Sequence, residues 1–216
     1  MKYLLLISIF YGLSLSGFSQ EREYSFVFLN DNPNKPDIPK HSVDSLQQLH
    51  LQNIGKMVRQ GKLSVAGPFE GGGGFFILNT SDTKKAKNWL ASDPAIAAER
   101  FRIEILPWQP REGSVCIVDE SVEMVSYTFV RYNTNITKFN VRVAPELFQQ
   151  HEEYIKQIVK TGNVISEGVF ANSDGGMMVL KGSVDPNVVM NDPTVANGII
   201  EPIIKRVWVG KGSFCE

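Results

Sequence analysis

The chain has little net charge and few cysteines or histidines. Lys and Arg total 22 against 23 Asp and Glu, and no basic run stands out. The sequence therefore gives no indication of nucleic acid or an anionic membrane surface as a partner. The 216 residues include only two cysteines and three histidines. Two cysteines cannot form a four-cysteine zinc site.

Motifs of several well-known enzyme classes are also missing. There is no Gly-x-Ser-x-Gly elbow, no His-Glu-x-x-His zinc motif and no Asp-rich loop with calcium spacing. Glycines cluster at residues 71–74 and 174–176, but these clusters lead into β-rich segments and no Lys-Ser/Thr follows. They indicate hairpin turns, with a phosphate-binding loop as the weaker alternative. We expect no cofactor and no metal.

The first 19 residues differ from the rest of the chain. Lys2 precedes a mostly apolar segment, and small residues at Gly17 and Ser19 fit a cleavage site. This is the pattern of a secretory signal peptide, and the apolar segment is short for a membrane span. An uncleaved anchor helix is the alternative. We expect an exported protein, periplasmic or secreted, with no membrane attachment after cleavage.

The remaining chain contains one module twice, offset by about 100 residues. We place repeat 1 at residues 20–108, a linker at 109–123 and repeat 2 at 124–216. The matches occur in the same order in both copies. They are Tyr24–Val27 with Tyr127–Val130, His50 and Gly61 with His151 and Gly162, Gly73–Leu78 with Gly175–Leu180, Asp93-Pro94 with Asp192-Pro193, Trp108 with Trp208, and Gly113–Cys116 with Gly212–Cys215.

Each copy has the same predicted element order, β-α-β-β-α-β. In copy one a strand at 24–29 precedes an amphipathic helix that we expect to begin near Asp44 and to end at Gly61. Strands at 63–66 and 75–78, a helix at 81–92 capped by Ser81 or Asp82, and a strand at 102–107 complete it. Copy two repeats this order from residue 127, with Pro145 in the first turn of its long helix.

This order is the ferredoxin-like split β-α-β unit, an α+β fold. Its sheet has helices on one face, and the other face must be buried. A second copy in the same chain can cover it, so we expect a pseudo-dimer in which two sheets pack face to face. Two separate domains on a flexible linker are the alternative. A pseudo-twofold axis would also bring Cys116 and Cys215 together as a disulfide; otherwise they would be two buried thiols.

Two of the three histidines occupy equivalent positions on the apolar face of each long helix. A buried imidazole needs a hydrogen-bond partner, and the acidic residues that recur with His50 and His151 are Asp93 and Asp192. Such a carboxylate would orient the imidazole for general acid–base catalysis. In the alternative interpretation the histidines are structural and each Asp-Pro ends a helix, with the aspartate free to cap. We expect His41 to lie on the surface.

These residues together resemble the YCII-related (YciI-like) family. Copy two matches less well, since Val169 stands where copy one has Pro68. The matching residues are His50-Leu51, Ile54, Gly61-Lys62-Leu63, Ala66-Gly67-Pro68, Gly73-Gly74, Asp93-Pro94 and Ile105-x-Pro107-Trp108 in copy one, with His151, Ile155, Gly162, Gly168, Asp192-Pro193 and Trp208 in copy two.

The resemblance implies a dimeric α+β barrel, formed here by two copies in one chain. It also implies an active site built on His50 with Asp93 and on His151 with Asp192. Most YciI-like proteins have no assigned substrate. The leading hypothesis is a lyase, isomerase or hydrolase acting on a small organic molecule. The alternatives are a non-catalytic module that binds a small molecule between the sheets, and an interaction protein without a pocket.

Overall fold

The computed structural model describes residues 23–119, 121–138, 140–171 and 175–216. The predicted signal peptide at residues 1–19 lies outside the described residues, and so does Asp174 of the second glycine cluster. No helix among the described residues combines the length and the hydropathy that a membrane span requires.

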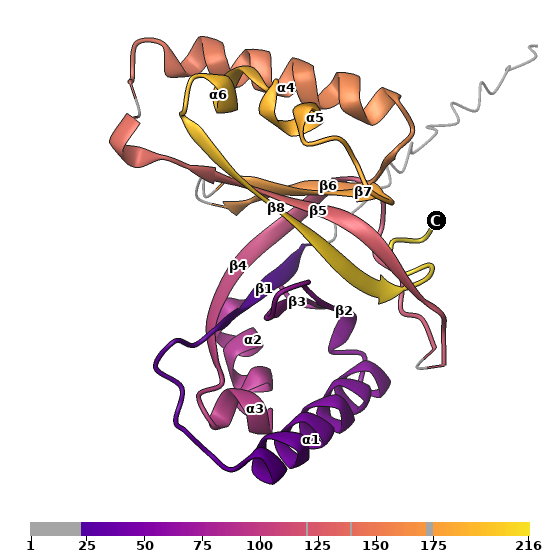
Figure 1. The fold of residues 1–216 in the computed structure, drawn as a ribbon. Coiled ribbons are helices and arrows are strands. Elements are labelled where there is room, and N and C mark those ends of the chain that lie inside the picture. Colours follow the sequence, from indigo (N-terminus) through magenta and orange to yellow (C-terminus); the bar gives the residue numbers. More distant parts are fainter. Residues whose placement is uncertain (1–22, 120, 139, 172–174) are drawn as a thin grey trace, which may run out of the picture.

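Both copies form the predicted β-α-β-β-α-β order, and each adds one short helix before its last strand (Figure 1). The elements of copy one are β1 Tyr24–Asp31, α1 Lys40–Arg59, β2 Leu63–Pro68, β3 Gly74–Leu78, α2 Thr83–Leu90, α3 Pro94–Ala97 and β4 Phe101–Glu112. Those of copy two are β5 Met124–Thr134, the 3-10 turn η1 Ile136–Lys138, α4 Ala144–Lys160, β6 Val164–Phe170, β7 Gly176–Lys181, α5 Asn187–Met190, α6 Pro193–Ala196 and β8 Ile200–Gly210.

The eight strands form one antiparallel sheet in the order β2-β3-β1-β4-β6-β7-β5-β8. Strand β4 of copy one joins β6 of copy two from Trp108↔Phe170 to Glu112↔Glu167. The two outer strands, β2 and β8, also meet: Phe69 bridges to Val207, and the backbone N–H of Glu70 donates to the carbonyl of Arg206 at 2.9 Å. The sheet therefore closes into a barrel, and the compact pseudo-dimer is confirmed.

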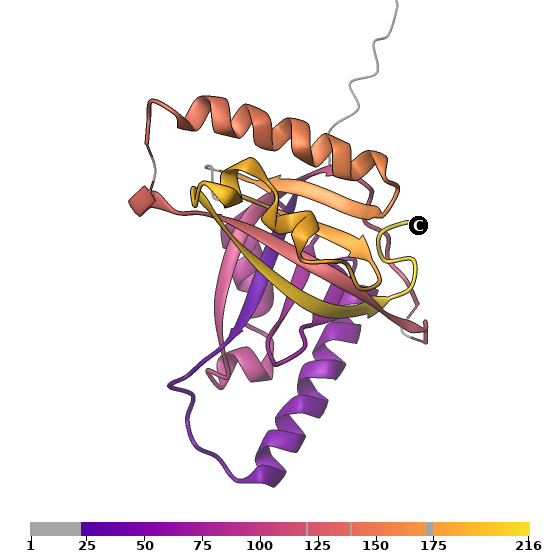
Figure 2. The same ribbon diagram turned by 45° about the horizontal axis from the view of Figure 1, so that its top comes forward.

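The helices cover the barrel from outside, those of copy one on one side and those of copy two on the opposite side (Figures 1 and 2). Aromatic side chains from both copies fill the barrel interior. Phe26, Phe75 and Phe129, for example, pack with ring centroids 4.9 to 6.0 Å apart. These rings fill much of the space in which the binding-module hypothesis placed its ligand.

The long helix of copy one begins earlier than predicted. It starts at Lys40, so Asp44 lies inside the helix and does not cap it. The physical reason lies in Pro39, whose extended conformation presents its carbonyl to the backbone N–H groups of Ser42 and Val43 at 2.9 and 3.2 Å. The other cap predictions are confirmed: Asp82 accepts from two backbone amides of α2, and Gly61 follows α1 with φ +66°.

One of the sequence matches between the copies is displaced by a residue. Tyr24 pairs with Trp108, whereas its repeat Tyr127 pairs with Val207. The structural counterpart of Trp108 is therefore Val207, and the predicted match with Trp208 was wrong. A one-residue displacement moves a side chain to the opposite face of a sheet. Trp108 is accordingly buried in the barrel, while Trp208 is only half-buried.

The segment between the copies is shorter than the predicted linker, because β4 continues to Glu112. Residues 115–118 form no strand, but Val115 packs in the core. Cys116 forms a disulfide with Cys215. The bond fastens the segment after copy one to the C-terminal end of copy two.

Candidate functional site

The two histidines that are equivalent under the repeat lie on the sheet-facing sides of their long helices. His50 of α1 is 6% exposed and His151 of α4 is 9% exposed. The ring of His50 stacks on Phe76 of β3, with centroids 5.9 Å apart, and also contacts Phe101. Burial of a polar ring requires a partner, and the predicted partners are in place. His41 is exposed, as expected.

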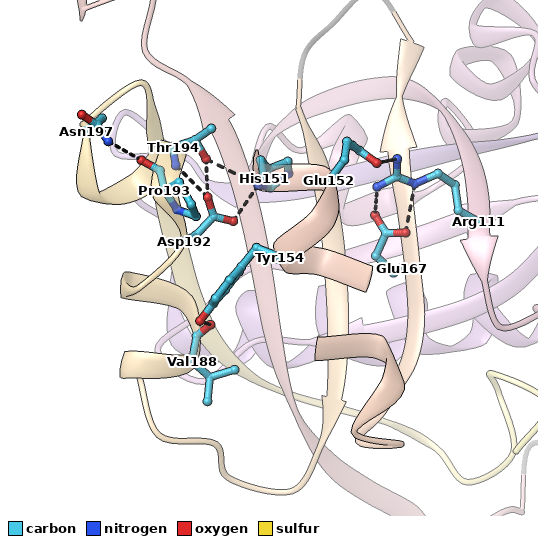
Figure 3. Close-up of polar contacts among 10 residues, drawn as sticks. All are labelled: Arg111, His151, Glu152, Tyr154, Glu167, Val188, Asp192, Pro193, Thr194 and Asn197. Carbon is cyan, nitrogen blue, oxygen red and sulfur yellow. Dashed lines mark hydrogen bonds and ion pairs between the residues drawn. The ribbon is translucent and has the colours of Figure 1, made fainter. Parts of the chain in front are cut away.

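Both aspartates contact their histidines. Nδ1 of His50 lies 2.9 Å from both carboxylate oxygens of Asp93. Nδ1 of His151 lies 2.6 Å from Oδ2 of Asp192 (Figure 3). The capping role considered as an alternative is present too, because Asp93 and Asp192 are the N-caps of the short helices α3 and α6. Each carboxylate therefore both caps the short helix that follows it and holds an imidazole.

Both carboxylates accept from the backbone N–H two residues on, Ala95 for Asp93 at 3.0 Å and Thr194 for Asp192 at 2.8 Å. Their other side-chain partners differ. Asp93 accepts a hydrogen bond from Asn53 Nδ2 at 3.1 Å, whereas Asp192 accepts from the hydroxyl of Thr194 at 2.5 Å (Figure 3). Burial opposes the ionisation of Asp192, but the hydrogen bond and charge of His151, together with Thr194, outweigh it and hold the pKa of Asp192 below its usual value. Asp192 is therefore ionised at neutral pH.

An ionised Asp192 fixes the tautomer of His151. A carboxylate can only accept, so Nδ1 of His151 carries the hydrogen that it donates. In the part of the chain that the structure describes, hydrogen bonds to the His151 ring all involve Nδ1. In the neutral ring, Nε2 is then the nitrogen with a free lone pair. It can accept a proton from a bound molecule.

A cavity of about 440 Å³ lies beside His151, between α4 and the sheet of copy two. Its volume falls within the range of small-molecule sites, roughly 300–1,000 Å³. One part of its wall is apolar and another is charged. The lining residues are Arg111, Tyr132, Thr134, Phe148, His151, Glu152, Glu167, Val169, Phe170, Gly175, Gly176 and Ile200.

The charged part of the wall is an ion-pair network centred on Arg111. Its Nε and Nη2 donate to Glu167 at 3.0 and 2.6 Å, and its Nη1 donates to Glu152 at 2.7 Å (Figure 3). Burial raises the pKa of Glu167 although Arg111 opposes the rise. Arg111 comes from β4 of copy one, whereas both glutamates belong to copy two. The cavity is thus completed by a residue of the other copy.

The surroundings of His50 in copy one differ from those of His151. A cavity of about 250 Å³ covers the matching surface, but it is lined by residues such as Leu51, Ile54 and Ala66 and does not include His50. The strand register and the repeat align the two sites position by position. Tyr132, Glu152 and Glu167 of copy two stand where copy one has Leu29, Leu51 and Ala66. Arg111 of copy one, which reaches the site of copy two, is equivalent to Gly210 of copy two, which lies at the smaller cavity over copy one.

The sequence interpretation found the two histidine–aspartate pairs but missed Tyr132, Glu152, Glu167 and Arg111. A signal for them existed, because each is a polar residue where the other copy has an apolar residue or glycine. Among the described residues, no group of three or more His, Cys, Asp or Glu side chains is arranged to hold a metal ion.

Comparison with known proteins gives a limited result. No protein-family model matches the chain, and no curated protein matches it either. Among solved structures, the chain is similar to one described as a "Putative monooxygenase" from Fusobacterium nucleatum, with 14% identity and a TM-score of 0.47 over 88% of this chain and 92% of that chain. A likeness this distant carries no functional argument. The fold class is established by the strand order and barrel closure of this chain, and the YCII-related resemblance stays a prediction.

Proposed function

We propose that this protein is an enzyme that uses His151 as a general acid–base on a small organic molecule bound in the 440 Å³ cavity. The observation that carries the proposal is the position of the His151 imidazole between Asp192 and the cavity. Nδ1 of His151 is held by an ionised Asp192, and the ring lines a cavity of suitable size.

The chemistry follows from the hydrogen bonds of the ring. Nε2 takes a proton from the bound molecule or from a water beside it, and the positive charge that forms on the ring is stabilised by Asp192 at 2.6 Å. The same nitrogen then returns the proton at another position. Isomerisation, elimination and hydrolysis all fit this cycle, in agreement with the lyase, isomerase or hydrolase class expected from the sequence.

We place the activity in copy two alone. His50 and Asp93 make the same contact, but the ring of His50 is covered by Phe76 and Phe101, and the cavity above copy one does not reach it. His50 then serves to orient α1 against Asp93 and the short helix α3. This assignment gives the histidines different roles despite their equivalent positions.

Export of the protein is part of the proposal. It rests on the predicted signal peptide at residues 1–19, and the Cys116–Cys215 disulfide supports it because such bonds persist in oxidising compartments. The test is fractionation of the native host followed by N-terminal sequencing of the protein. A chain that starts at Met1 in the reducing compartment would contradict export.

The catalytic role can be tested with His151→Gln and, as the matched control, His50→Gln. Both variants and the unchanged protein are incubated in D₂O with a panel of small ketones, lactones and esters, and product formation and deuterium uptake are followed by NMR. We expect turnover of at least one class, a loss of about 10²–10⁴-fold in His151→Gln and little change in His50→Gln. Binding without turnover would favour the non-catalytic binding module, and equal losses in both variants would contradict the single site.

A further inference from the structure

Tyr132 has a buried hydroxyl with no partner. The residue lies on β5 and is 3% exposed. Among the residues that the structure describes, its hydroxyl makes no hydrogen bond. A buried phenol normally finds a partner, because an unsatisfied polar group is costly in a protein interior. Because Tyr132 is one of the residues that line the cavity, a ligand bound there can provide the missing acceptor.

The position of Tyr132 relates this hydroxyl to the proposed base. Tyr132 lines the same cavity as His151, and the two rings meet edge to face with centroids 5.4 Å apart. In copy one the equivalent residue is Leu29, which has no hydroxyl. The phenol is therefore present only in the copy whose histidine reaches a cavity.

The surroundings keep the phenol protonated. Burial raises the pKa of Tyr132, and the negative charges of Asp192 and Glu167 raise it further. The hydroxyl therefore remains an O–H at neutral pH and can donate a hydrogen bond. An acceptor oxygen on the ligand is the group it suits.

The charges around the cavity restrict what kind of oxygen this is. Glu152, Glu167 and Asp192 carry three negative charges near the site, and the guanidinium of Arg111 is already engaged by both glutamates. A carboxylate or phosphate ligand would meet net negative charge there. An uncharged carbonyl oxygen meets no such penalty, and the apolar wall with Phe148, Phe170 and Ile200 accommodates the rest of the molecule.

We propose that Tyr132 donates a hydrogen bond to the carbonyl oxygen of an uncharged substrate while Nε2 of His151 removes a proton from the carbon beside that carbonyl. The C–H bond breaks, its electron pair forms an enolate, and the proton moves to Nε2. The charge that develops on the oxygen is stabilised by Tyr132. Return of the proton to carbon regenerates the imidazole, so the cycle is balanced without an oxidant or reductant. This inference rests on the proposed function of His151.

The test uses cyclohexanone labelled with ¹³C at the carbonyl, in D₂O, with the unchanged protein, Tyr132→Phe and His151→Gln. Tyr127→Phe is the matched control, because Tyr127 lies on the same strand but packs in the barrel core. We expect a downfield carbonyl shift on binding and deuterium exchange beside the carbonyl. Tyr132→Phe should abolish the shift and lower kcat for exchange by about 10²-fold or more, with a smaller effect on KM. Tyr127→Phe should keep both signals.

Each outcome separates the two proposals. A carbonyl shift and an exchange rate unchanged in Tyr132→Phe would overturn the role of Tyr132 while leaving His151 to be judged by its own variant. No binding of cyclohexanone, together with tight binding of its 4-carboxylate analogue, would overturn the uncharged substrate class. If no ketone binds at all, the Tyr132 proposal is wrong, and turnover of esters or lactones that depends on His151 would still support the proposed function.

Discussion

Glu167 of β6 accepts two hydrogen bonds from the guanidinium of Arg111 on β4, at 3.0 and 2.6 Å. The two residues belong to different copies of the repeat, and their contact lies at the seam where β4 and β6 pair. Glu167 is buried, whereas the side chain of Arg111 is 31% exposed. This difference in burial makes the pair asymmetric. If Glu167 is removed, the guanidinium of Arg111 can still be solvated, whereas the carboxylate of Glu167 stays buried if Arg111 is removed.

Arg111→Met should therefore destabilise the protein more than Glu167→Met at neutral pH. Removing Arg111 leaves a buried carboxylate without its cation, which costs up to about 3 kcal/mol. Removing Glu167 leaves a guanidinium that still contacts Glu152 and solvent, at a cost of about 1 kcal/mol or less. Urea unfolding of both variants and of the double variant measures these differences. A double variant less stable than Arg111→Met would contradict this explanation.

The same pair predicts a pH dependence. Burial raises the pKa of Glu167 above its usual value in the folded protein. A carboxyl with a raised folded pKa stabilises below its unfolded pKa, and that contribution is lost as pH rises through the folded pKa. Without Arg111 the rise in pKa should be larger. We expect the destabilisation of Arg111→Met to be small near pH 4 and to grow toward pH 7, as measured by unfolding at each pH.

Asp192→Asn should show the opposite pH dependence. The pKa of Asp192 is lowered in the folded protein, so its contribution is present above the unfolded pKa and is lost as pH falls through the folded pKa. We expect a loss of about 1–3 kcal/mol at pH 7 that shrinks below pH 3.8, the ordinary value. Asp37→Asn is the control, because Asp37 is exposed. A constant loss between pH 7 and pH 3 would show that Asp192 does not act through its charge.

Loss of the disulfide should destabilise the protein strongly. Cys116 and Cys215 are 99 residues apart, and closing a loop of that length stabilises by about 4–5 kcal/mol in the chain-entropy model. We expect a lower Tm for Cys116→Ser/Cys215→Ser, measured by calorimetry, and no further change on adding reductant to that variant. Alkylation of two thiols in the unreduced protein would show that the bond is not formed.

The two tryptophans near the ends of β4 and β8 should respond differently to truncation. Trp108 is 1% exposed in the barrel core, so Trp108→Ala should cost about 3–5 kcal/mol. Trp208 is half-buried on the face of β8 that points away from the barrel core, so Trp208→Ala should lower the free energy of unfolding clearly less. Denaturant unfolding of both variants measures this. Equal losses would contradict the register in which Val207, and not Trp208, replaces Trp108.

The repeat was the feature through which the sequence predicted most of the fold. Six ordered matches implied two equal modules, and the unburied sheet face of one module implied pairing with the other. The positions of His50 and His151 at helical spacing then placed both rings against the sheet, where Asp93 and Asp192 meet them. These inferences succeeded because they depend on periodicity and equivalence, which are local properties of a sequence.

The features that the sequence did not predict depend on contacts between distant strands. Arg111 was assigned to a linker because nothing local indicates that β4 continues through it to pair with β6. Trp108 was matched with Trp208 because the two residues are identical. The strand register shows that the equivalent position is one residue earlier, at Val207. The short helices α3 and α6 were missed because a single turn has no periodicity to detect.

The origin of Arg111 has an evolutionary consequence. A duplicated module is usually free to diverge when its twin retains the activity. Here the strand of copy one that carries Arg111 forms part of the cavity of copy two. Even if His50 is not catalytic, deletion of copy one or substitution of Arg111 would damage the cavity of copy two. Natural selection should therefore treat the two copies as one heritable unit, and the gene should resist fission between them.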